Sequence, residues 1–233
     1  MAAPGSLPLY QQISELLIRD IASGRLIDGE RLPPERDMAA ELGIAVGTLR
    51  QALKDLTSKG LLDRVQGSGN YIRARADPVS VYALLRIEFA TGGGLPTARV
   101  LSVDRLPKDP RLPGFGTSPE GHRIRRLRFL SGVVAAVEEI WLDASYIPRI
   151  EIGDLSESLY LYYRKVLGLW IARAEDSIGQ GPLPDWTPTE FPHPAGRQLP
   201  LITRISRDQT GQSAEASFTW YDPETVRYVA RLK

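Results

Sequence analysis

The strongest constraint in the sequence is a pair of closely spaced helical segments within residues 32–62, LPPERDMAAELGIAVGTLRQALKDLTSKGLL. The first begins after two prolines and ends at Gly43, because proline suits a helix start and glycine a helix stop. The second runs from about residue 47 to residue 58 and has one apolar face. Two helices joined by so tight a turn predict a helix-turn-helix.

An amphipathic segment precedes this pair and a hairpin follows it. In residues 8–24, PLYQQISELLIRDIASG, apolar residues recur at three- and four-residue steps, as one face of a helix requires. After residue 60, LLDRV and NYIRA are typical of short strands around the glycine-containing turn QGSG. Three helices and a hairpin predict a winged helix-turn-helix, whose third helix enters the major groove of DNA. The alternative is a small α/β domain whose polar helix face is only solvated.

The distribution of charge along the chain is consistent with DNA binding, although the net charge does not require it. The net charge of the chain is +1. Residues 50–75 hold six basic and two acidic side chains, so this stretch carries a local charge of about +4. A mixed-charge surface also produces such clusters by chance, and the patch therefore supports the helix-turn-helix without proving it.

Composition limits the remaining classes of protein. At 233 residues with 42% hydrophobic content, the chain is long enough for two domains with separate cores. It contains no cysteine, which excludes disulfides and thiolate metal sites. No basic leader with an apolar run behind it and no apolar stretch of about 18 residues is present. We therefore expect a cytoplasmic protein with no membrane partner.

The stretches PLYQQI, LPPERDMAAELGIAVGTLRQALKDLTSKGLL and GSGNYI together resemble the N-terminal domain of the GntR family of bacterial transcription regulators, over roughly residues 7–73. The resemblance implies DNA contacts by Arg36, Thr48, Arg50, Gln66 and Gly67. The polar face of the third helix adds Gln51 and Lys54, and the wing turn adds Ser68.

The chain departs from the family at Ala45-Val46, where many members have Ser-Arg. That difference removes a common helix cap and a common base-reading arginine. Val46 and Gly47 are expected instead to make apolar contact with thymine methyl groups. We expect direct base readout to be correspondingly sparse.

The sequence changes character after a short connection, ARADPV, at residues 74–79. Beyond it, TARVLSVDRL, HRIRRLRFL, VVAAVEEIWLD, LPLITRISRD and SAEASFTWYD predict strands. SESLYLYYRKVLG predicts a helix, and IGQGPLPDWTPTEFPHPAG is rich in turn residues. The predicted organisation is a DNA-binding domain in residues 1–73, a linker in residues 74–79, and an α+β domain with a mostly antiparallel sheet in residues 80–233.

This second part resembles the UTRA ligand-sensing domain of the HutC branch of the GntR family, which shares its fold with chorismate lyase. The resemblance rests on IRRLRF, VEEIWL, SLYLYYRKVLG and AEASFTWYD. It implies an effector such as a sugar phosphate or a small carboxylate. The pocket positions that it implies are Arg126, Arg128, Glu138, Ser158, Tyr160, Glu215 and Tyr221.

The spacing of these residues suits an anion. Arg126 and Arg128 are two apart, so on a strand they lie on one face and their guanidinium groups can bind one phosphate or carboxylate. Ser158 at a helix start adds a hydroxyl beside free backbone N–H groups. The alternative is a set of cross-strand ion pairs on an exposed sheet, which contribute little.

The functional prediction is a homodimeric transcription regulator, a repressor that binds a palindromic operator on double-stranded DNA and is released by a small anionic metabolite. With two histidines and no cysteine, we expect no metal site, and we expect no cofactor and no catalytic residues. The alternative is a chorismate-lyase-like enzyme activity in the second domain. SVYALLRIEFATGGGLP and IGQGPLPDWTP both differ from the family pattern beside the pocket, so the sequence does not identify the effector.

Overall fold

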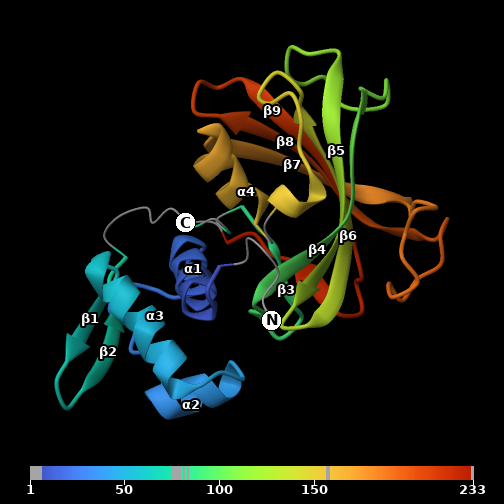
Figure 1. The fold of residues 1–233 in the computed structure, drawn as a ribbon. Helices are drawn as coiled ribbons and strands as arrows, with labels where there is room; N and C mark the ends of the chain where they lie inside the picture. The colour runs from blue at the N-terminus through green and yellow to red at the C-terminus, as the bar shows by residue number, and fades with distance from the viewer. Residues whose placement is uncertain (1–6, 75–79, 81, 83, 156–157, 232–233) are drawn as a thin grey trace. The chain divides into compact units, whose positions relative to one another are not determined.

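The computed structural model describes residues 7–74, 80, 82, 84–155 and 158–231. They form two compact units, one of residues 7–86 together with the chain from Val229, the other Ile87–Tyr228 (Figure 1). The predicted linker falls almost entirely on residues 75–79, which lie outside the described residues. Ser80, predicted to begin the second domain, donates its hydroxyl to the backbone oxygen of Glu15 in the first unit at 2.9 Å. None of the helices in the described ranges is long and apolar enough to cross a membrane.

The first unit is a winged helix-turn-helix, as predicted. Its elements are α1 (Leu9–Ala22), α2 (Glu35–Glu41), α3 (Val46–Ser58), and a hairpin of β1 (Leu62–Val65) and β2 (Gly69–Ile72). The apolar faces of the helices meet in a core in which Ile13, Leu49 and Leu56 are completely buried. Gly43, just after α2, has a φ of 65°, which glycine adopts without steric cost and which ends the helix.

The second unit is built on a six-stranded antiparallel sheet in the order β4-β5-β6-β9-β8-β7. The strands are β4 (Pro96–Pro107), β5 (Glu120–Leu130), β6 (Val133–Asp143), β7 (Ile171–Pro182), β8 (Gln198–Asp208) and β9 (Ser213–Tyr221). A separate ladder pairs β3 (Ile87–Phe89) with β10 (Val226–Tyr228). The predicted α+β class with a mostly antiparallel sheet is confirmed.

The two faces of this sheet have separate coverings. On one face, α4 (Leu159–Tyr162) and the segment around a short 3-10 helix (Ile152–Asp154) pack on Ile124, Ile140 and Leu142 (Figure 1). On the other face, Leu183 and Phe191 from the connection between β7 and β8 pack on strand residues that include Leu127, Val137 and Trp220. Polar residues on the first face are therefore enclosed between the sheet and the α4 segment.

Strand β7 was not predicted, because IGQGPLPDWTPTEFPHPAG looks like turn material. The first five residues of that stretch instead complete β7, and β8 pairs along its length. Gly181 explains why glycine is present there. A Cβ at this position would lie 2.8 Å from Leu201 and 3.4 Å from Trp220, so the strands pack closely only without a side chain.

The predicted helix over SESLYLYYRKVLG is only partly correct. Residues 156 and 157 lie outside the described residues, and α4 covers four residues before a π-helical turn, Tyr163–Leu167, takes over. The turn ends at Gly168 with a φ of 61°. Single π-turns occur frequently at functional sites, and this one positions Tyr163, whose hydroxyl reaches Glu215 on β9.

Candidate DNA-contact surface and effector site

The predicted DNA contacts lie on α3, the start of α2 and the wing. The apolar side of α3 is buried, and Arg50, Gln51 and Lys54 are exposed on its other side. Val46, Gly47 and Thr48 form its first turn, and Arg36 is exposed on α2. In the wing turn, Gln66 and Gly67 are exposed, and the Ser68 hydroxyl lies 2.7 Å from that of Tyr71.

A carboxylate that the sequence prediction omitted links two parts of this surface. Glu35, the first residue of α2, accepts a hydrogen bond at 2.7 Å from Nε of Arg50 on α3. Its other oxygen accepts from Arg64 on β1. A groove of about 480 Å³ runs beside this pair, and its lining includes Arg64 and the wing residues Gln66, Gly67 and Ser68.

Arg126, Arg128 and Glu138, predicted as effector contacts, meet inside the second unit. Register pairs Arg126 of β5 with Glu138 of β6, and both arginines point to the face covered by α4. Nη2 of Arg126 lies 2.7 Å from one Glu138 oxygen, and Nε of Arg128 lies 2.7 Å from the other. The cross-strand ion pairs of the alternative are therefore present, but all three residues are at most 7% exposed, so they do not lie on an exposed sheet.

The protonation of Glu138 follows from this geometry. Burial alone would raise its pKa, but the positive charges of Arg126 and Arg128 and their hydrogen bonds outweigh that effect and lower the pKa to about 2. Glu138 is therefore ionised near neutral pH, and the three side chains together carry one positive charge.

Glu215 is the centre of a second buried group on the same face. It accepts hydrogen bonds from the hydroxyls of Tyr163 at 2.8 Å, Ser206 at 3.0 Å and Tyr160 at 3.2 Å. Burial raises the pKa of Glu215, although Tyr163 and Ser206 oppose the shift. Of these residues, the sequence prediction included Tyr160 and Glu215 but omitted the other two.

Arg204 and Asp176 extend this group toward β7. Arg204 binds Asp176 through two parallel hydrogen bonds of 2.5 and 2.7 Å, and Tyr228 donates to the same carboxylate at 2.9 Å. Arg204 and Ser206 are two residues apart in LPLITRISRD, the same spacing that identified Arg126 and Arg128. That signal was present in the sequence, whereas Asp176 lies on the strand that was not predicted.

The remaining two predicted effector residues lie on the same side of the sheet. The Ser158 hydroxyl caps α4 by accepting from the backbone N–H of Leu161 at 3.3 Å. Tyr221 pairs with Ala136, which pairs with Arg128, so register directs all three to one face. The seven predicted effector residues therefore belong to one face of the sheet and the segment that covers it.

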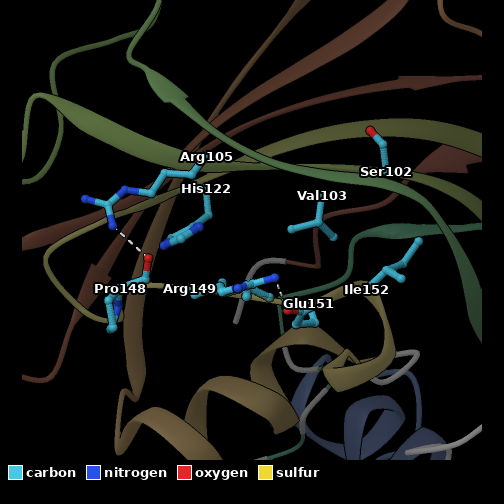
Figure 2. A pocket seen from close by; sticks show the side chains of 9 residues that line it. Ser102, Val103, Arg105, His122, Pro148, Arg149, Glu151 and Ile152 are labelled. Carbon is cyan, nitrogen blue, oxygen red and sulfur yellow. Dashed lines mark hydrogen bonds and ion pairs between the residues drawn. The ribbon is translucent and has the colours of Figure 1, made fainter.

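A groove elsewhere in this unit has a different lining. It has a volume of about 630 Å³ and lies between β4 and the segment around Pro148–Ile152 (Figure 2). Its arginines bind neighbouring protein groups, since Arg105 donates to the backbone oxygen of Pro148 and Arg149 pairs with Glu151. None of the predicted effector residues lines it.

Comparison with known families matches both units. Residues 9–72 match the family described as bacterial regulatory proteins, gntR family, and residues 91–227 match the UTRA domain. This chain belongs to the GntR family and carries a UTRA domain. It is a DNA-binding transcription regulator related to the histidine utilization repressors, one of which, from Pseudomonas putida, is 27% identical over 71% of this chain and 69% of its own length.

Further relatives span most of the chain. It is 61% identical to the HTH-type transcriptional regulator SmoD of Agrobacterium fabrum, over 98% of each chain. It is 28% identical to the mannosyl-D-glycerate transport/metabolism system repressor MngR of Escherichia coli, over 75% of each chain. The structure of YydK from Bacillus subtilis has a TM-score of 0.52 at 22% identity, covering 97% of this chain and all of that one, which supports the fold.

Two substitutions on the α4 face of this UTRA domain have contrasting expected effects. Glu138→Gln leaves two buried arginines without their anion, and we expect it to reduce the free energy of unfolding by about 3–5 kcal/mol at pH 7. Glu215→Gln keeps an oxygen that accepts from the tyrosines and should cost less than about 1.5 kcal/mol. Urea denaturation followed by tryptophan fluorescence tests both, since all four tryptophans lie in this unit.

The pH dependence gives a second test of Glu138. Its folded pKa of about 2 lies below the ordinary value of 4.5, so its stabilisation is complete above pH 4.5 and is lost as the pH falls toward 2. The stability difference between wild type and Glu138→Gln should therefore narrow over that range. A difference that stays constant with pH would contradict this assignment of charge.

Proposed function

We propose that this regulator is a homodimeric repressor that binds a palindromic operator and releases it when a small anion binds the α4 face of its UTRA domain. The observation that carries the proposal is the convergence of Arg126 and Arg128 on one buried carboxylate. Two adjacent guanidinium groups that hold a carboxylate inside the protein have the geometry to hold a carboxylate or phosphate of a ligand.

The charge of the enclosed groups favours an anion. Arg126, Arg128 and Arg204 face Glu138 and Asp176 on this side of the sheet, an excess of one positive charge over these two carboxylates, and burial raises the pKa of the third acidic group, Glu215. An entering anion neutralises that charge. We infer that it competes with Glu138 for the arginines and that Glu138 then accepts hydrogen bonds from donors on the ligand.

The polar groups around the arginines favour a ligand with hydroxyl or amine groups. Ser158, Tyr160 and Tyr221 offer hydroxyls, and Glu215 offers an acceptor. A sugar phosphate or a hydroxylated carboxylate combines both requirements. The name of the relative MngR refers to mannosyl-D-glycerate, a compound with one carboxylate and several hydroxyls, which is consistent with this class.

We infer that the UTRA domain senses its ligand and does not convert it, in contrast to a chorismate-lyase-like enzyme. The attached DNA-binding unit supports this inference, because a sensor must retain its ligand whereas a catalyst must release a product. Relatives named as repressors, including MngR and NagR of Bacillus subtilis, support repression as the direction of control. The proposed location is the bacterial cytoplasm, where operator DNA is found.

For the homodimer we propose pairing through β7, an edge of the six-stranded sheet. Most residues of β7 are exposed, and Ile178 is 54% exposed, whereas the opposite edge strand, β4, is mostly half-buried. A long exposed edge strand offers unpaired backbone groups to a second chain. Two copies joined there would present two winged helices to the two halves of a palindrome.

Substitutions on α3 test the DNA contacts. Arg50→Ala should cost about 1–3 kcal/mol of operator binding and relax sequence specificity, because arginine reads guanine with two hydrogen bonds. Lys54→Ala should weaken binding to all sequences and reduce the salt slope by about one. Lys59→Ala is the control, because the Lys59 side chain is paired with Asp55. Unchanged footprinting by Arg50→Ala would exclude the proposed docking.

Calorimetry with sugar phosphates, organic acids and amino-acid derivatives tests the effector site. Arg126→Lys and Arg128→Lys keep the charge but lose the paired donors, and we expect each to weaken anion binding about tenfold or more. Arg125→Lys is the matched control, since Arg125 pairs with Glu139 on the opposite face. Equal affinity in all three variants would remove the arginines from the site, and a product detected by mass spectrometry would favour an enzyme.

Sedimentation of the full chain at micromolar concentration tests the dimer. We expect a dimer for wild type and a large shift to monomer for Ile178→Lys, because a buried interface would have to enclose the new charge. Val133→Lys is the control, since Val133, the first residue of β6, is 49% exposed. A dimer that resists Ile178→Lys would place the interface elsewhere.

A further inference from the structure

The carboxylate of Glu35 joins the recognition helix to the wing. One oxygen accepts from Nε of Arg50 on α3, and the other accepts from Nη2 of Arg64 on β1. Arg64 has a second partner inside the unit. Its Nε donates to the side-chain oxygen of Asn70 on β2 at 3.2 Å, and Asn70 is buried. Side chains from α3 and β1 therefore converge on one carboxylate of α2.

The exposed fractions of the three side chains show which of them is held most firmly by the protein. The side chain of Glu35 is 19% exposed, whereas those of Arg50 and Arg64 are 61% and 46% exposed. Glu35 follows Pro33 and Pro34, whose restricted φ angles limit the movement of the chain at the start of α2. The carboxylate is thus fixed by its own element, and the arginines reach to it from the solvent side.

The ionisation state suits this role. The hydrogen bond from Arg50 is the largest effect on the pKa of Glu35 and lowers it, and the charges of Arg50 and Arg64 lower it further. Glu35 is therefore ionised near neutral pH, where DNA binding would take place. An acidic group beside two arginines opposes the approach of phosphates, so its benefit must come from the orientation that it imposes.

We propose that Glu35 is a positioning residue for operator recognition, which sets the direction of Arg50 in the major groove and the distance between α3 and the wing. The inference depends on the proposed docking of α3. With Glu35 in place, Arg50 enters the groove in one orientation, and Arg64 is limited in its contacts with phosphates. Glu35 thus lowers affinity for DNA in general and raises discrimination between sequences.

The test measures both quantities on two duplexes of equal length: one selected by the wild-type protein from a random library, the other a scrambled version. In Glu35→Gln we expect tighter binding to the scrambled duplex, a salt slope steeper by about one, and a preference for the selected duplex that falls about fivefold or more. Glu41→Gln, an equal charge change at the exposed far end of α2, should shift both affinities by one common factor.

Glu35→Asp separates position from charge. It keeps the carboxylate but shortens its reach, so we expect the preference for the selected duplex to fall here as well, without the change in salt slope. Retention of the full preference by Glu35→Asp or Glu35→Gln, with the fold verified by circular dichroism, would overturn the proposal. If the wild-type protein selects no sequence from the library, the proposed operator recognition is wrong, and this outcome is distinct from a failure of the Glu35 proposal.

Discussion

Two arginines share one buried carboxylate in the middle of the six-stranded sheet, and the arrangement of the second unit depends on this interaction. Removing three charges from water is costly, and only close pairing with hydrogen bonds compensates for it. The register of β5 on β6 sets Arg126 opposite Glu138, and the α4 segment closes over that face. A shift of one residue would send these charges to the face packed by Leu183 and Phe191.

The same arrangement occurs at the DNA-contact surface with a different consequence. Glu35 binds Arg50 and Arg64 at the surface, where water and salt weaken the attraction, so these pairs orient the arginines more than they stabilise the fold. Glu138 binds its arginines away from water, where the attraction is stronger and both partners are buried.

The parts that were predicted correctly are those with strong local signals. The winged helix-turn-helix follows from helical periodicity, prolines, glycines and a short hairpin, all within 65 residues of sequence. The common face of Arg126 and Arg128 follows from the two-residue period of a strand. Strand β7 and the π-turn after α4 were not predicted, because the first is stabilised by pairing with β8 and the second brings Tyr163 to Glu215. Both depend on residues more than fifteen positions away.

The sequence by itself determined the two units, their classes and the residue types that are proposed to contact an anion or DNA, since these depend on periodicity and on the chemistry of single side chains. Only the tertiary structure decided which groups are paired. Glu35 lies between Arg50 and Arg64, and Arg204 meets Asp176, because elements distant in sequence pack together. Pairing of charges depends on distances of a few ångströms in three dimensions, and no local pattern in a sequence encodes such distances.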